Sequence, residues 1–225
     1  MATQLDLEEQ EQLDRLKAFW AQYGNLISGV LIVVTGAYLA WFGWNWYQRD
    51  QGIKAGAMYD EFDRAFQAAD AERSARIFND MKERFPRAAF TGQAGLAAAK
   101  LAAEKGQADA ARAALGWVAD NASEKEYRSI ARLRLAGQLL DEKKYDEALK
   151  QLEGVDAGEF AALAADRRGD VLLVPGKTEE AKAAYAKAWA AMDAKVDYRR
   201  VVEAKLNVLG ADPAASAASG AGSGK

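Results

Sequence analysis

The feature that most constrains this chain is an apolar stretch over residues 24–47, GNLISGVLIVVTGAYLAWFGWNWY. No Asp, Glu, Lys or Arg occurs between Lys17 and Arg49. At about 1.5 Å per residue, a helix over these residues is long enough to cross the ~30 Å hydrocarbon core of a bilayer. A helix buried in a globular core usually keeps some charge along its wetter edge. The stretch therefore predicts a transmembrane anchor.

Aromatic side chains lie at both ends of the stretch, where a ring and a polar N–H or O–H suit the headgroup region. They are Phe19, Trp20 and Tyr23 before it, and Trp41, Phe42, Trp44, Trp46 and Tyr47 near its end. No small-residue cleavage site follows, so we expect an uncleaved anchor. Basic residues lie close to the stretch on both sides, so the charge bias does not decide its orientation.

Small residues recur along the stretch at helical spacing. Gly29, Gly36 and Gly43 are seven residues apart and predict a smooth stripe that another membrane helix can approach closely. Glycine is also common in membrane helices in general, and that explanation stays open. The candidate helix-contact stripe consists of Ser28, Gly29, Thr35, Gly36, Ala40 and Gly43.

The segment before the anchor, residues 1–23, is acidic and partly amphipathic. Leu13, Leu16 and Trp20 share one face of a predicted helix, and acidic side chains occupy the opposite face. Two interpretations stay open. The segment is either a solvated tail that becomes helical near the membrane, or a short interfacial helix that docks a partner.

The composition excludes several classes of chemistry. The chain has no cysteine and no histidine, which excludes disulfides, thiolate nucleophiles, Cys/His zinc sites and histidine acid–base catalysis. The net charge is −3, and the acidic excess lies within the first fifty residues. The remainder has no net charge and lacks the basic surface that nucleic acid requires. We expect no catalytic residues, no metal or cofactor, and no nucleic-acid partner.

Residues 48–210 predict helix after helix, with abundant alanine and no alternation of period two. Aligning the segment on the small residues Ser74, Ala111, Ala148 and Ala181 gives intervals of 37, 37 and 33 residues. This spacing is typical of tetratricopeptide-like helix pairs. In the last pair, Gly169 is expected where the two helices meet. We expect a capping helix over residues 197–210, with its charged side outward.

The predicted fold is therefore all-α, with one N-terminal transmembrane helix, an α-solenoid of about four tetratricopeptide-like helix pairs, and a capping helix. Residues 211–225, rich in alanine, glycine and serine, predict a disordered tail.

The concave side of such a stack is the expected protein-binding surface. Repeat alignment selects three residues from each of three pairs, although ordinary packing within the stack is the alternative for the apolar ones. The candidates are Gln93, Leu96, Lys100, Ile130, Leu133, Gly137, Leu163, Asp166 and Asp170. Asp166 and Asp170 lie one turn apart beside Arg167 and Arg168, a pattern that favours a solvated ion-pair surface over acid–base chemistry or cation binding.

The order of these segments resembles the YfgM family of ancillary SecYEG translocon subunits, over about residues 8–210. The resemblance rests on the acidic opening EEQEQLDRLKAFWAQYGN, on a single span ending in GWNWYQ, and on two repeat segments. These segments are RSIARLRLAGQLLDEKKYDEALKQL and DRRGDVLLVPGKTEEAKAAYAKA. The Ala/Gly/Ser-rich tail has no assigned role in this pattern.

The resemblance implies a single-pass protein of the bacterial inner membrane, with a cytoplasmic N-terminus and a periplasmic helical domain. It implies association with the SecYEG channel and with PpiD, a membrane-anchored periplasmic chaperone. The implied role is to hold or hand on secreted proteins at the channel exit, with no active-site residues. The alternative is a tetratricopeptide scaffold of another cell-envelope assembly complex.

Overall fold

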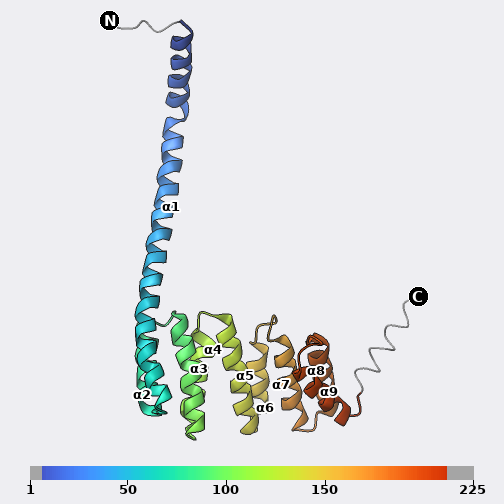
Figure 1. The fold of residues 1–225 in the computed structure, drawn as a ribbon. Coiled ribbons are helices and arrows are strands. Elements are labelled where there is room, and N and C mark those ends of the chain that lie inside the picture. Colours follow the sequence, from blue (N-terminus) through green and yellow to red (C-terminus); the bar gives the residue numbers. More distant parts are fainter. Residues whose placement is uncertain (1–6, 212–225) are drawn as a thin grey trace, which may run out of the picture. The chain divides into compact units, whose positions relative to one another are not determined.

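The computed structural model describes residues 7–211, and its secondary structure over this range is helical (Figure 1). The predicted tail, apart from Ala211, lies outside the described residues. The helices are α1 (Leu7–Gln67), α2 (Ala71–Arg84), α3 (Ala89–Glu104), α4 (Ala108–Asn121), α5 (Lys125–Asp141), α6 (Tyr145–Glu153), α7 (Ala161–Leu173), α8 (Thr178–Ala191) and α9 (Tyr198–Val208).

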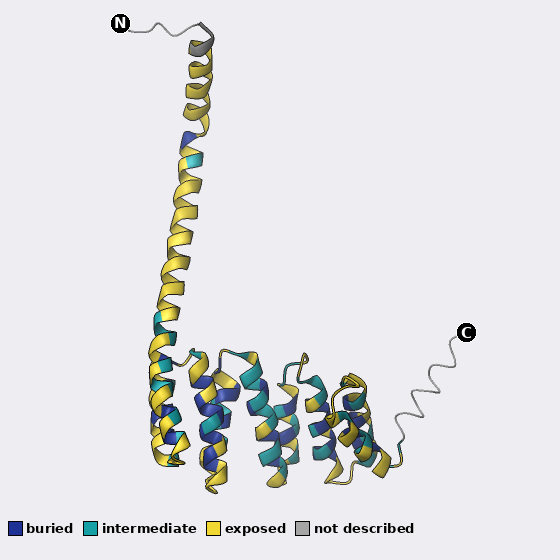
Figure 2. Cartoon of the chain, viewed as in Figure 1, coloured by how far each residue is buried: buried dark blue, intermediate teal, exposed yellow. Residues whose placement is uncertain are grey.

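Helix α1 contains the predicted anchor and continues beyond it. Among the described residues it is the one helix long and apolar enough to cross a membrane, and its most apolar window is 0% buried. Figure 2 shows this exposure along the helix. The chain divides into two compact units, residues 1–51 and residues 52–225. The last part of α1, from Gly52 to Gln67, therefore belongs to the second unit.

The second unit consists of four helix pairs and one further helix, as the repeat spacing predicted. The end of α1 packs with α2 in a shared apolar cluster, α3 pairs with α4, α5 with α6, and α7 with α8, while α9 packs against α8. Each small residue used for the alignment lies at a close helix crossing. Ser74, Ala111, Ala148 and Ala181 are each at most 1% exposed. The predicted all-α architecture is confirmed.

Gly169 is required where α7 crosses α8. A Cβ atom added at Gly169 would lie 2.4 Å from Cε1 of Tyr185, a ring that is itself buried. That separation is far shorter than a normal van der Waals contact. The absence of a side chain at Gly169 therefore allows Tyr185 to fill the centre of the last pair.

The turns inside the four pairs share one backbone geometry. Ala69, Gly106, Lys143 and Gly176 have positive φ angles of 52°, 73°, 61° and 87°. After each of them, a backbone N–H donates to a carbonyl five residues earlier, as from Gln107 to Ala102 (2.8 Å) and from Lys144 to Leu139 (2.8 Å). These are Schellman-type helix ends. The four pairs therefore repeat the backbone conformation of their turns as well as their helices.

Three apolar clusters form the core of this unit. The first joins pairs one and two and the start of α5 around Phe62, Phe78 and Val118. The second lies between α5, α6 and α7, and the third joins α7, α8 and α9 around Tyr185. The first two clusters draw on more than one pair, and the third joins the last pair to α9, so each pair depends on a neighbour for a buried core.

Candidate functional site

The first helices of the last three pairs, α3, α5 and α7, present residues at the same register. We call this surface the A-helix face. Its members are spaced by three, four, three and four residues, which is one side of a helix, and none is buried. They are Phe90, Gln93, Ala97, Lys100 and Glu104 in α3; Tyr127, Ile130, Arg134, Gly137 and Asp141 in α5; and Phe160, Leu163, Arg167, Asp170 and Val174 in and around α7.

Six of the nine residues expected to bind protein lie on the A-helix face. They are Gln93, Lys100, Ile130, Gly137, Leu163 and Asp170. The middle residue of each predicted triplet does not. Leu96 is 8% exposed and belongs to the core, Leu133 packs partly buried against the second apolar cluster, and Asp166 is 2% exposed.

The helical period explains this correction. Successive residues lie about 100° apart around a helix, so Leu96, Leu133 and Asp166 are turned by about that angle from their neighbours Ala97, Arg134 and Arg167 and point toward the stack. The residues on the face are Ala97, Arg134 and Arg167 instead. The repeat intervals relate these three to one another, so the sequence contained the signal that identifies them.

A hollow of about 270 Å³ opens on the A-helix face between α3 and α5. Its lining is mostly apolar, with Leu115 of α4 and two alanines among charged side chains. Lys100 and Glu104 pair with each other at 3.8 Å between Nζ and Oε1. Arg134 Nη1 donates to the carbonyl oxygen of Leu96 at 3.2 Å. The full lining is Ala99, Lys100, Ala103, Glu104, Leu115, Arg134 and Gln138.

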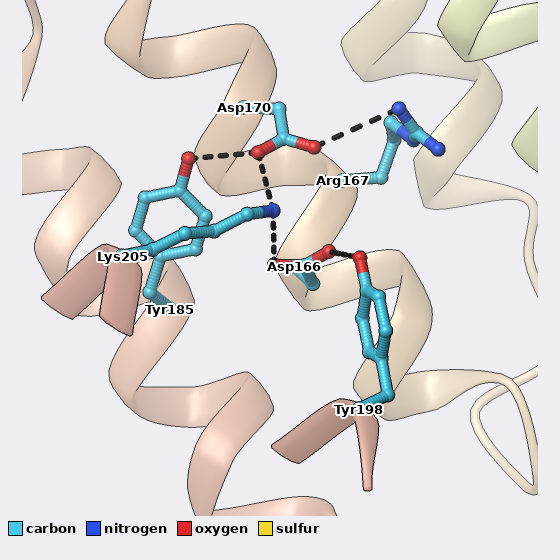
Figure 3. Close-up of polar contacts among 6 residues, drawn as sticks. All are labelled: Asp166, Arg167, Asp170, Tyr185, Tyr198 and Lys205. Atoms are coloured by element: carbon cyan, nitrogen blue, oxygen red, sulfur yellow. Dashed lines mark hydrogen bonds and ion pairs between the residues drawn. The ribbon is translucent and has the colours of Figure 1, made fainter. Parts of the chain in front are cut away.

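A polar cluster that is only partly buried lies where α9 packs on the last pair, and Figure 3 shows its members. Lys205 Nζ lies 2.7 Å from Oδ1 of Asp166 and 2.7 Å from Oδ1 of Asp170. Tyr198 donates its hydroxyl to Asp166 at 2.8 Å, and Tyr185 donates to Asp170 at 2.8 Å. Arg167 Nη1 lies 3.6 Å from Oδ2 of Asp170, so the cluster brings two carboxylates together with one ammonium, one guanidinium and two phenols.

Burial and the two carboxylates together set the protonation of this cluster. Burial raises the pKa of Tyr185, and the hydrogen bond to Asp170 raises it further. The pKa of Tyr198 is raised by burial and then by its bond to Asp166. Burial lowers the pKa of Lys205, but the hydrogen bonds and charges of Asp166 and Asp170 outweigh it, and the pKa lies above its ordinary value. Lys205 therefore stays charged and both phenols stay neutral near pH 7.

Two expectations about this region are wrong. Asp166 and Asp170 do not form a solvated ion-pair surface, because Asp166 is buried and both carboxylates contact Lys205. The capping helix α9 does not turn all its charge outward, because Lys205 points into the stack. The partners are 39 and 35 residues apart in sequence, so no local pattern could reveal the contact. The cluster is occupied by its own side chains and attaches α9 to α7.

The small-residue stripe in the membrane segment lies open along α1. Ser28, Thr35 and Ala40 are exposed, and a Cβ atom added at Gly29, Gly36 or Gly43 would meet nothing within 4 Å. Within the part of the chain that the structure describes, no group of three or more Asp or Glu side chains is arranged to hold a metal ion.

Comparison with known proteins agrees with this architecture. Residues 17–211 match the family model described as a tetratricopeptide repeat-like domain. A protein of Neisseria gonorrhoeae named ancillary SecYEG translocon subunit is 30% identical over 90% of this chain and 98% of its own length. Proteins of the same name from Haemophilus influenzae and Escherichia coli are each 28% identical, over 81% and 89% of this chain and 89% and 96% of their own lengths. No solved structure matches the chain.

These relatives share the whole layout rather than the repeats alone. The alignment with the first relative covers nearly all of that protein, so it includes the anchor as well as the helix pairs. The family consists of accessory subunits with a tetratricopeptide repeat-like domain, and it is not an enzyme family. The chain belongs to the YfgM family of ancillary SecYEG translocon subunits.

Proposed function

We propose that this protein is a membrane-anchored accessory subunit of the SecYEG translocon whose A-helix face binds secreted proteins as they leave the channel. The observation that carries the proposal is that face itself. It crosses three successive helix pairs and offers apolar and charged side chains at matching positions. The names of the relatives connect the family with the translocon.

The mechanism is binding without covalent chemistry. Half-exposed apolar residues such as Tyr127 and Ile130 lie beside charged residues such as Arg134, a mixture that holds many unfolded sequences weakly. The anchor adds effective concentration, because a domain tethered at the membrane meets emerging chains at a far higher local concentration than a free one. Weak contacts then suffice to hold a segment and release it.

The proposed orientation places the N-terminus in the cytoplasm and the helical domain in the periplasm. PpiD is the proposed neighbour in the membrane, and the small-residue stripe is its proposed contact or that of a channel helix. A Cβ atom added at Gly29, Gly36 or Gly43 would meet nothing within 4 Å, so a leucine at each position starts from open space on the helix surface. Reduced recovery of channel subunits with this variant would therefore report a lost contact between helices.

Site-specific photocrosslinking tests the binding surface. A photoreactive residue at Gly137 on the A-helix face should crosslink to a secretory chain stalled in the channel. The same residue at Lys150, which is exposed on α6 away from that face, should not. Equal crosslinking at both positions would mean that the A-helix face has no special role.

A pull-down in mild detergent tests the translocon connection separately. Recovery of channel subunits together with PpiD supports the proposal. Recovery of cell-envelope assembly proteins without the channel would support a scaffold of another envelope complex instead, with the same fold and a different task.

A further inference from the structure

The hollow between α3 and α5 is lined by a mostly apolar surface, although four of its seven lining residues are charged or polar. Ala99 and Leu115 are buried core residues, and Ala103 lies on the exposed side of α3. Its volume of about 270 Å³ is slightly below the usual range for small-molecule sites, roughly 300–1,000 Å³, and it is open to solvent. It has the size and chemistry to take one large aliphatic side chain.

The charges around the hollow are unequal. Lys100 is paired with Glu104 on the same helix, so these two neutralise each other. Arg134 is exposed, and it has no carboxylate partner in the portion of the chain that the structure describes. The rim therefore presents one uncompensated positive charge, which is complementary to an acidic group on a ligand.

Arg134 is also held in place. Its Nη1 donates to the carbonyl oxygen of Leu96 at 3.2 Å, so a side chain of α5 reaches across to α3 beside the hollow. A guanidinium group has five N–H donors in a fixed plane, and this bond uses one of them. The remaining donors are available to a carboxylate, and the bond to Leu96 reduces the entropy that binding would cost.

We propose that this hollow is the anchoring subsite for an extended secretory segment with an aliphatic residue and an acidic residue two positions apart. In an extended chain, side chains two residues apart point to the same side, about 7 Å from each other. The aliphatic side chain enters the hollow while the acidic side chain pairs with Arg134. This inference rests on the proposed function and adds a sequence preference to it.

Blocked fluorescent peptides of about ten residues, long enough to cross the face when extended, provide the test. All are acetylated and amidated and carry an uncharged fluorophore, so their only charge is at the tested position. The set contains Leu-x-Glu, Leu-x-Gln, Leu-x-Lys and Ala-x-Glu in one neutral background. Binding to the full chain in lipid nanodiscs is followed by fluorescence anisotropy.

The Leu-x-Glu peptide should bind most tightly. Replacing its glutamate with glutamine should weaken binding about two- to fivefold, the range of a solvent-exposed ion pair. Replacing its leucine with alanine should weaken binding about fivefold or more through the lost apolar contact. Equal affinity for the four peptides would overturn the inference.

Two variants localise the effect. Arg134→Glu should reverse the preference, so that Leu-x-Lys binds better than Leu-x-Glu. Ala103→Phe places a side chain over the hollow from its exposed rim and should remove the discrimination between leucine and alanine. The matched control is Arg200→Glu, an exposed arginine of α9 outside the A-helix face, which should leave the order unchanged. Circular dichroism confirms that each variant keeps its helical content.

Failure of this subsite and failure of the proposed function give different results. If the peptides bind but Arg134→Glu does not reverse their order, the subsite is wrong, and crosslinking of stalled chains at Gly137 can still support the function. If no peptide binds and Gly137 gives no crosslinks to a stalled chain, both proposals fail together.

Discussion

At the scale of single residues, backbone handedness separates the four turns into two kinds. Gly106 and Gly176 adopt positive φ without steric cost, whereas Ala69 and Lys143 adopt it with a side chain attached. A left-handed residue other than glycine costs about 1–2 kcal/mol, because its Cβ atom approaches the backbone. The first and third turns therefore carry local strain that the second and fourth avoid.

Replacing Ala69 with glycine should stabilise the domain by about 0.5–1 kcal/mol. The gain from relieving the left-handed strain exceeds the loss from a more flexible unfolded chain. The measurement is the midpoint of urea unfolding followed by circular dichroism. The control is Ala68→Gly, one residue earlier, where φ is not positive and only the loss should appear.

Gly169→Ala should destabilise the last pair by about 2 kcal/mol, because the new methyl group forces Tyr185 away from its buried position. Gly137→Ala is the matched control, since a Cβ atom at Gly137 would meet nothing within 4 Å. It lies inside α5, so alanine there should raise stability by up to about 1 kcal/mol. Thermal unfolding should show changes in stability of opposite sign for the two variants. Equal changes would contradict the close crossing of α7 and α8 at Gly169.

At the scale of elements, α9 is attached to the stack by apolar packing and by one charged side chain. Val202 and Leu206 are buried in the third cluster, and Lys205 reaches two carboxylates of α7. A terminal helix of a solenoid protects the apolar face of the last pair, so its attachment controls how readily that end opens.

Lys205→Met should reduce the stability of this end by about 3 kcal/mol, because Asp166 would remain buried without a charge partner. In the variant, the rate of amide hydrogen exchange should increase in α8 and α9, and it should not increase in α3 and α4. The control is Lys195→Met, at an exposed position in the α8–α9 connection. It should change neither the stability nor the rate of hydrogen exchange. Adding Asp166→Asn to Lys205→Met should recover part of the loss, since it removes the unpaired charge.

The polar cluster also predicts the response of α9 to alkaline pH. Tyr185, Tyr198 and Lys205 all have pKa values raised above those of the unfolded chain, so the folded state binds more protons there. Their contribution is complete below about pH 10 and decreases as the pH rises through the folded-state pKa values. Stability should fall with pH above about 10, and Tyr198→Phe should make that fall shallower. If the dependence of stability on pH is the same in Tyr198→Phe, the Tyr198 hydroxyl does not contribute to it.

At the scale of the whole molecule, the chain combines a membrane segment with a helical domain on one polypeptide. The span and the first repeat share helix α1, which runs from Leu7 to Gln67 without an intervening loop. The proposed role depends on which side of the membrane carries the helical domain.

Labelling of single cysteines decides that side, because the natural chain contains none. Asn79→Cys lies exposed on α2, and Gln12→Cys lies exposed near the start of α1. With a membrane-impermeant thiol reagent on intact spheroplasts, Asn79→Cys should be labelled, and Gln12→Cys only after lysis. The reverse pattern would place the helical domain in the cytoplasm and exclude binding at the channel exit.

The sequence alone determined the features that depend on local periodicity. An uncharged run of residues 24–47 identifies the anchor, and small residues at intervals of 37, 37 and 33 identify the four pairs. The first signal is local side-chain chemistry, and the second is the recurrence of small residues along the chain; both can be recognised without knowing the tertiary contacts. The same intervals relate Arg134 to Arg167, so most residues of the A-helix face could also be predicted from the sequence.

Only the tertiary structure decided which charges are buried and where the face is hollow. Asp166 and Lys205 are in contact although they are 39 residues apart in sequence. Arg134 donates to the carbonyl oxygen of Leu96, which is 38 residues earlier. The sequence placed Asp166 on a solvated surface because an aspartate beside two arginines usually lies there. The direction of each side chain depends on the rotation of its helix against its neighbours, and a few tens of degrees separate a binding surface from a core.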